Sequence, residues 1–171
     1  MKPSFRINRL LKPGPYRMEE VFADIRACPV LREIFADERE IDRVVSEIAV
    51  SITDRPHVMF VDNHDATITI GMAYLREASD EFLYLDIIHE LCHVKQHLQG
   101  LDLYDRSKSY VDRETEIDAY RITVREARRI GLDDEAICHY LQVPWISHEE
   151  HERLAARMGV ENGLRTRRNA S

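Results

Sequence analysis

The longest hydrophobic pattern in the chain predicts one long helix over residues 79–99. Ser79 is a suitable N-cap, acidic residues follow it in the first turn, and Gly100 stands where the helix should end. Within this span the run FLYLDIIHELCHV, at 82–94, is apolar on nearly all sides. A helix of this kind is normally buried on several faces. The pattern therefore predicts a buried helix at the centre of the fold.

Shorter patterns predict a β-hairpin and further helices. HVMFVD at 57–62 and ATITIG at 66–71 are rich in β-branched and apolar residues and flank a short polar turn, which is typical of a hairpin. Helical patterns or capping signals mark the remaining helices, which are expected over 19–27, 38–52, 109–130, 133–141 and 148–158. Helices and strands do not alternate as in a βαβ fold, so the predicted class is α+β.

Length and composition predict a single compact domain. The chain has 171 residues, of which 44% are hydrophobic and 32% charged, as in ordinary globular proteins. Three prolines near the start predict an irregular N-terminal arm over 1–18. We expect one domain over 19–160 and a polar, basic tail over 161–171.

Charge and cysteine content exclude several classes of protein. The net charge of −7 argues against a general nucleic-acid binder, because such proteins bind phosphates through Lys and Arg. No segment approaches the ~20 apolar residues that span a bilayer, and the start lacks the apolar run of a signal peptide. We therefore expect a cytoplasmic protein without a membrane partner.

Cys28, Cys92 and Cys138 are odd in number and far apart, so they indicate neither a disulfide framework nor a CxxC metal site.

Residues 89–93 spell HELCH, which matches the pattern HExxH. Residues four apart on a helix lie ~5–6 Å apart on one face, so His89 and His93 can bind the same ion. Zinc binds neutral imidazole nitrogens, and a catalytic zinc site has three protein ligands and one water. Glu90 suits the role of general base in this motif. The prediction is one Zn²⁺ per chain; the alternative is two core histidines whose nitrogens bond to backbone or carboxylate groups.

The third zinc ligand must come from outside the motif. The segment VDRETEIDAY offers four carboxylates, those of Asp112, Glu114, Glu116 and Asp118. Helical phase puts Glu116 at the edge of the apolar stripe, whereas Glu114 and Asp118 align with arginines on the polar face. Glu116 is therefore the preferred ligand. His97, one turn after His93, is expected to neighbour the site or lie at the surface.

HELCH followed by Glu116, 23 positions after His93 (116 − 93), resembles the gluzincin group of zinc metallopeptidases. The small size resembles the minigluzincins, and TEIDAY is similar to the glutamate helix of ImmA/IrrE-type peptidases. The comparison covers roughly residues 57–130. It implies a compact zincin-like domain with a small sheet or hairpin, a buried active-site helix and a following helix that carries the glutamate. In that group a sheet edge binds the substrate as an added strand.

Two departures limit the resemblance. Many gluzincins carry an aspartate four residues after the glutamate ligand, where this chain has Tyr120. A partner for the first histidine is therefore unassigned. Metzincins have HExxHxxGxxH, and this chain has Gln96 and Gln99 at the last two specified positions, which excludes that group.

The resemblance implies hydrolysis of peptide bonds in a peptide or protein substrate. Zinc-bound water attacks the carbonyl, and Glu90 takes the proton and passes it to the leaving amine. Tyr104, Tyr110 and Tyr120 are candidates for a transition-state donor, although a structural role is expected of each. One alternative is a metal-dependent amidohydrolase with a non-peptide substrate. Another is a non-catalytic zinc-binding protein that captures a partner strand along the hairpin edge.

Two further features have a structural and a functional interpretation. His148 and His151 are three positions apart and could hold a second metal, but Ser147 and Glu150 form a capping-box pattern at the same place. Cys92 lies inside the HELCH motif and is expected to be a small core residue rather than a redox switch. We also hypothesise that the N-terminal arm or self-association restrains the peptidase.

Overall fold

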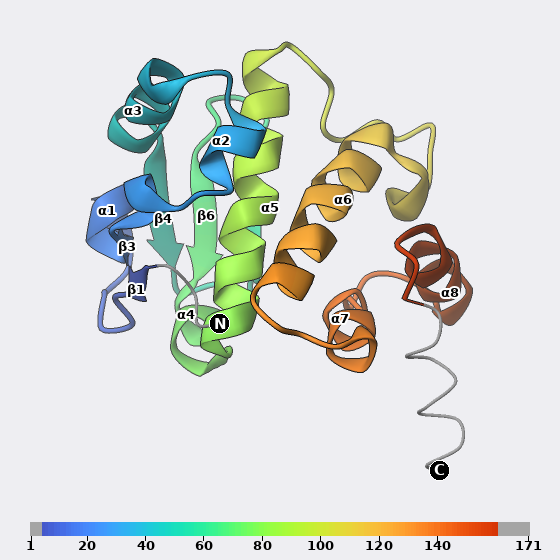
Figure 1. Ribbon diagram of the computed structural model, residues 1–171. Helices are drawn as coiled ribbons and strands as arrows, with labels where there is room; N and C mark the ends of the chain where they lie inside the picture. Colours follow the sequence, from blue (N-terminus) through green and yellow to red (C-terminus); the bar gives the residue numbers. More distant parts are fainter. Residues whose placement is uncertain (1–4, 161–171) are drawn as a thin grey trace. The chain divides into compact units, whose positions relative to one another are not determined.

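The computed structural model describes residues 5–160 and shows an α+β protein, as predicted (Figure 1). The chain divides into two compact units, one ending at Tyr104 and one beginning at Asp105. The two units do not test the predicted domain limits, so residues 19 and 160 remain predicted limits. The predicted basic tail, 161–171, lies outside the described residues.

The main sheet of the first unit has four strands in the order β2–β4–β6–β5. They are β2 Gly14–Arg17, β4 Ala49–Thr53, β5 Met59–Val61 and β6 Ile68–Gly71. β4 and β6 run parallel, and the other two pairs are antiparallel. The predicted hairpin is confirmed as β5 and β6. Its outer strand, β5, forms one edge of the sheet, and β2 forms the other.

The prediction of an irregular N-terminal arm is wrong for two segments. β1 (Arg6–Ile7) pairs with β3 (Phe22–Ala23), and β2 pairs with β4. Pro15 fits β2 because an edge strand has one side that needs no backbone N–H donor. Arg9 also donates to the Leu75 carbonyl oxygen at 2.9 Å. The segment is therefore part of the fold, and its removal would take a strand from the sheet.

Two predicted helices are shorter in the structure, because strands follow them closely. The predicted helix over 19–27 is α1 (Met18–Val21), then β3 and a short 3₁₀ turn at Ile25–Ala27. Asp24 interrupts it with a positive φ of 70°. The predicted helix over 38–52 ends early as α3 (Glu38–Glu47) and is followed by β4.

The error at β4 has a clear physical reason. Val50 and Ile52 are buried while the residues between and beside them are less so, which is the two-residue period of a strand. Apolar residues at 48 and 52 also fit the four-residue spacing of a helix. Pairing with β2 and β6 decides in favour of the strand.

The long helix α5 (Asp80–Leu98) confirms the central prediction. The Ser79 side chain accepts from the Phe82 N–H at 3.1 Å, and Gly100 ends the helix with a φ of +78°. α2 (Leu31–Ile34) packs against α5, and β5 does so as well. Lys95 on α5 donates to Glu40 on α3 at 2.7 Å, which ties these two helices together.

A close approach of backbone occurs where β6 passes into α4 (Met72–Glu77). A Cβ atom at Gly71 would lie 2.0 Å from the His57 carbonyl oxygen, which is far inside van der Waals contact. Only glycine fits at this position.

The second unit consists of helices within the described residues. α6 (Glu114–Arg129) follows a short 3₁₀ turn at Tyr110–Asp112, so the predicted helix over 109–130 begins with a break. α7 (Asp134–Tyr140) and α8 (His148–Arg157) confirm the last two predicted helices. The Ser147 and Glu150 capping box is present, with bonds of 3.1 and 2.8 Å.

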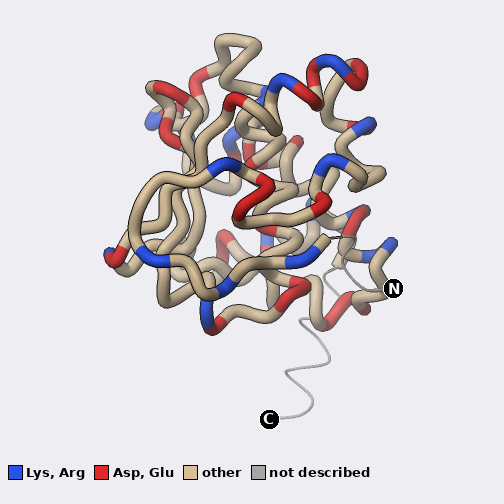
Figure 2. The backbone as a smooth tube through the Cα atoms, turned by 90° about the vertical axis from the view of Figure 1, so that its left-hand side faces the viewer, with Lys and Arg blue, Asp and Glu red and all other residues tan. Residues whose placement is uncertain are grey.

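Charged residues of both signs are interspersed along the backbone (Figure 2). Several form ion pairs on the first unit, including Arg32 with Glu38 at 2.6 Å and Arg9 with Asp80 at 2.6 Å. Across residues 5–160, no helix combines the length and the apolar character that a membrane span requires.

Candidate metal centre

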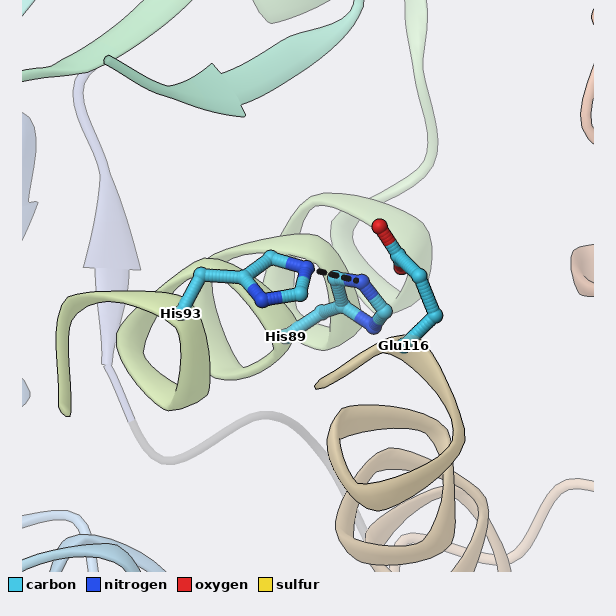
Figure 3. Close-up of side chains that lie close together, drawn as sticks. All are labelled: His89, His93 and Glu116. Carbon is cyan, nitrogen blue, oxygen red and sulfur yellow. Dashed lines mark hydrogen bonds between the residues drawn. The ribbon is translucent and has the colours of Figure 1, made fainter. Parts of the chain in front are cut away.

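His89 and His93 lie one turn apart on α5, and a ring nitrogen of each points toward the other (Figure 3). The two Nε2 atoms are 3.0 Å apart, and the ring planes are at 84°. Both side chains are buried, with exposed fractions of 5% and 6%. Two nitrogens bound tetrahedrally to one zinc at 2.0–2.1 Å would be about 3.3 Å apart. The rings therefore need only a small adjustment to bind one ion.

Gln96 contacts the second histidine and was not predicted as part of the site. Its Oε1 lies 2.7 Å from His93 Nδ1, and its side chain is buried. A carbonyl oxygen can only accept, so Nδ1 carries the proton and Nε2 keeps its lone pair. A signal was present in the sequence, because residues 89, 93 and 96 place polar side chains on one face of a helix whose central run, 82–94, is mostly apolar.

Glu90 is the third member of the motif on α5, and it is also buried, with an exposed fraction of 7%. Charged side chains are seldom buried unless they contact a cation or several donors. A buried carboxylate next in sequence to a candidate metal ligand fits the role of a base. Cys92 is buried too, which agrees with the core role predicted for it.

Glu116 on α6 completes the candidate ligand set. One ligand atom from each of His89, His93 and Glu116 lies within 4.8 Å of the others, and all three residues are buried (Figure 3). This group could hold a metal ion. Two imidazoles and a carboxylate are the donors found in catalytic zinc sites, although they also suit other divalent metals.

The other carboxylates of the segment are used differently. Glu114 and Asp118 are exposed, as the helical phase predicts, and Asp118 pairs with Arg121 at 2.9 Å. Asp112 accepts from Arg157 at 2.9 Å and from the Ser109 hydroxyl at 2.6 Å. The Ser109 bond and the two nearby arginines lower the pKa of Asp112. Glu116 is therefore the only one of the four carboxylates in this segment that is buried.

The three candidate tyrosines have partners that indicate structural roles. Tyr104 donates its hydroxyl proton to the Val61 carbonyl oxygen at 2.5 Å. The hydroxyls of Tyr110 and Tyr120 bond to each other at 2.9 Å. His97 is half-buried and outside the metal-binding group.

The histidine pair on α8 does not form a second metal centre. His151 is buried, and its Nε2 donates to the Cys138 carbonyl oxygen at 2.8 Å. His148 is exposed and lies 3.2 Å from Glu152. Within residues 5–160, His89, His93 and Glu116 are the only group found that could hold a metal ion.

The site thus combines two imidazoles whose Nε2 atoms converge, a buried carboxylate that can complete a ligand set, and a second buried carboxylate within the motif. Such a group can bind a divalent cation and place a base beside it. A scan against protein-family models, a search of curated proteins and a search of solved structures each found no match.

Proposed function

We propose that this protein is a zinc-dependent peptidase. The observation that carries the proposal is the convergence of His89 and His93 within an HExxH motif, on a helix that also buries Glu90. The proximity of a Glu116 ligand atom supports a three-residue ligand set. The resemblance of this motif and its downstream glutamate to gluzincins supports peptide bonds as the substrate.

Each residue has a distinct part in the proposed reaction. His89, His93 and Glu116 would hold the zinc, which supplies a Lewis acid that polarises the scissile carbonyl and acidifies water. Glu90 takes the proton from the attacking water. It then delivers that proton to the nitrogen of the leaving amine.

The edge strand β5 offers a place for an extended peptide. β5 packs against α5, which carries the motif, and it pairs with β6 on one side only. A peptide added as a further strand would use the outward backbone groups of Met59 and Val61. Zinc chemistry and strand addition together favour a peptide over a small amide. The cytoplasmic location and self-association remain predictions.

The decisive experiment compares the zinc-loaded wild type with Glu90→Gln on casein and on a peptide library. Glu81→Gln is a matched control, since it changes the same group near the start of the same helix. We expect equal zinc content in all three proteins and cleavage by all except Glu90→Gln. Loss of the base should reduce the rate by about 100-fold or more.

Each other outcome identifies a different function. Zinc binding with cleavage of small amides alone would indicate an amidohydrolase. Zinc binding without any cleavage would contradict the peptidase proposal and favour capture of a partner strand. Wild-type protein that binds no zinc would refute the metal centre itself.

A further inference from the structure

We infer that Gln96 is a positioning residue that sets the tautomer of His93 for metal binding. The inference rests on the proposed metal centre, but it concerns a residue outside the ligand set. Its basis is the bond between His93 Nδ1 and Gln96 Oε1, 2.7 Å long and buried on both sides. Metal-bound histidines usually donate their second ring N–H to an oxygen acceptor, which fixes ring orientation.

The two orientations of the amide have opposite consequences. With Oε1 toward the ring, Nδ1 carries the proton and the Nε2 lone pair faces His89. With the amide NH₂ group toward the ring, Nδ1 would accept a hydrogen bond, and Nε2 would carry a proton where a metal must bind. Gln96 therefore holds His93 in the form that binds metal. An aliphatic residue would leave both tautomers available.

The position of Gln96 on the helix makes this control firm. It lies three residues after His93, so the two side chains are on the same face of α5. Its own backbone carbonyl accepts from the Gln99 and Leu101 N–H groups at 3.1 Å each, so the helix end is fixed around it. The amide thus reaches His93 from rigid backbone.

The test uses Gln96→Leu, which removes the acceptor, and Gln96→Glu, which keeps one. Gln99→Leu is the matched control because Gln99 is exposed at the end of the same helix. Zinc affinity is measured by competition with a chelator. We expect Gln96→Leu to weaken binding by about 10-fold to 100-fold. Gln96→Glu and Gln99→Leu should stay within a few-fold of wild type.

A second readout separates positioning from general damage to the fold. Long-range ¹H–¹⁵N NMR spectra of the metal-free protein report which nitrogen of His93 is protonated. We expect the Nδ1–H form in wild type and Gln96→Glu, and a mixture with the Nε2–H form in Gln96→Leu. Unchanged zinc affinity in Gln96→Leu, or an Nε2–H form in wild type, would overturn the inference. These readouts need no peptidase activity, so failure of the proposed reaction is seen separately.

A different contact leads to a second inference, that Tyr104 weakens peptide binding at β5. The bonds from Asp62 N to Thr67 O and from Gly71 N to Val58 O show that the residues on either side of β5, Val58 and Asp62, direct backbone groups inward, toward the neighbouring strand. Pairs alternate in an antiparallel ladder, so the Val61 carbonyl points outward, to the free edge. The Tyr104 hydroxyl donates to that oxygen at 2.5 Å. An added strand would need the same acceptor.

Tyr104 is accessible from the solvent, because the residue is 40% exposed and follows the end of α5 in a loop. A peptide that pairs with Val61 must first displace the phenol. The hydroxyl is therefore a competitor for the edge, and its removal should tighten binding. This second inference also rests on the proposed function, since it assumes that peptides bind along β5.

The test measures binding of fluorescein-labelled oxidised insulin B chain to zinc-loaded Glu90→Gln, which binds without cleavage. Tyr104→Phe is added to this background. Tyr16→Phe is the matched control, because Tyr16 also donates to a backbone oxygen, that of Lys12 at 2.9 Å, beside the opposite sheet edge. We expect about fivefold tighter binding with Tyr104→Phe, as for one hydrogen bond, and no change with Tyr16→Phe. Equal or weaker binding, or none to any variant, would overturn the inference, while cleavage by the wild type tests the function independently.

Discussion

The histidine pairs on α5 and α8 have similar spacing in the sequence but use their ring nitrogens differently. His89 and His93 are both buried, and their Nε2 atoms converge to 3.0 Å. On α8, His151 spends its Nε2–H on the Cys138 carbonyl oxygen, and its partner His148 is exposed. The Nε2–Nε2 contact on α5 is a hydrogen bond between two prospective ligands, which a metal ion between them would replace, whereas the N–H of His151 is held by a buried backbone carbonyl that offers a metal nothing in exchange. The comparison teaches that existing hydrogen bonds, more than spacing, decide whether paired histidines can bind a metal.

The largest expected effect breaks the pair on α5. His93→Ala should reduce zinc affinity by about 1000-fold, because only one imidazole of the motif remains. His148→Ala, the control from α8, should leave zinc affinity unchanged. Competition with a chelator measures both. Equal losses of zinc affinity in His93→Ala and His148→Ala would contradict the proposed difference between the two histidine pairs.

A smaller loss is expected at the third ligand. Glu116→Gln should weaken zinc binding by about 100-fold, since a neutral amide oxygen is a poorer ligand than a carboxylate. Glu114→Gln makes the same change two positions away on an exposed side chain and should have no effect. Zinc affinity that is unchanged in Glu116→Gln would leave the histidine pair without this ligand.

The pair on α8 should affect stability instead of zinc binding. His151→Ala removes a buried ring and its bond to Cys138, so unfolding free energy should fall by about 2–3 kcal/mol. His148→Ala should change it by less than about 0.5 kcal/mol. Urea unfolding of the metal-free proteins measures these values. A large loss of zinc affinity in His151→Ala, with the fold intact, would contradict its structural role.

The smallest effect concerns the attachment of α5 to α3. Hydrogen bonds from Lys95 and from the Ala36 N–H lower the pKa of Glu40. A lowered folded-state pKa adds stability above the unfolded value, about 4.3, and this stability is lost as the pH falls through the folded-state pKa. Glu40→Gln should therefore cost about 1 kcal/mol at pH 7 and progressively less below pH ~4. Urea unfolding at several pH values measures this. A cost that is the same at all pH values would exclude the ion pair as its source.

The parts of the fold with strong local signals could be predicted from the sequence. α5 combines a cap at Ser79, a stop at Gly100 and an apolar pattern long enough to distinguish a helix from a strand. The hairpin has two β-rich runs around a turn. The prediction of a helix at 48–52 is wrong, because the apolar positions of this segment fit both periods and only pairing with other strands decides between them. The same holds for β2, whose proline and glycine suggest a loop.

The candidate site shows the same limit. The motif identified His89, Glu90 and His93 as candidates, and helical phase identified Glu116 as the buried carboxylate of its segment. Nothing in the motif points to Gln96, because a glutamine carries no charge and belongs to no expected ligand pattern. Its importance depends on where its amide oxygen points, which the sequence does not reveal.

Gly71 illustrates how a position can tolerate no change without taking part in chemistry. A Cβ atom at Gly71 would overlap the His57 carbonyl oxygen, so any side chain would force the backbone at 55–57 away from the end of β6. In a collection of relatives, selection on folding alone would keep this residue invariant. Invariance at position 71 would therefore report a packing constraint, and a search for active-site residues by conservation should set it aside.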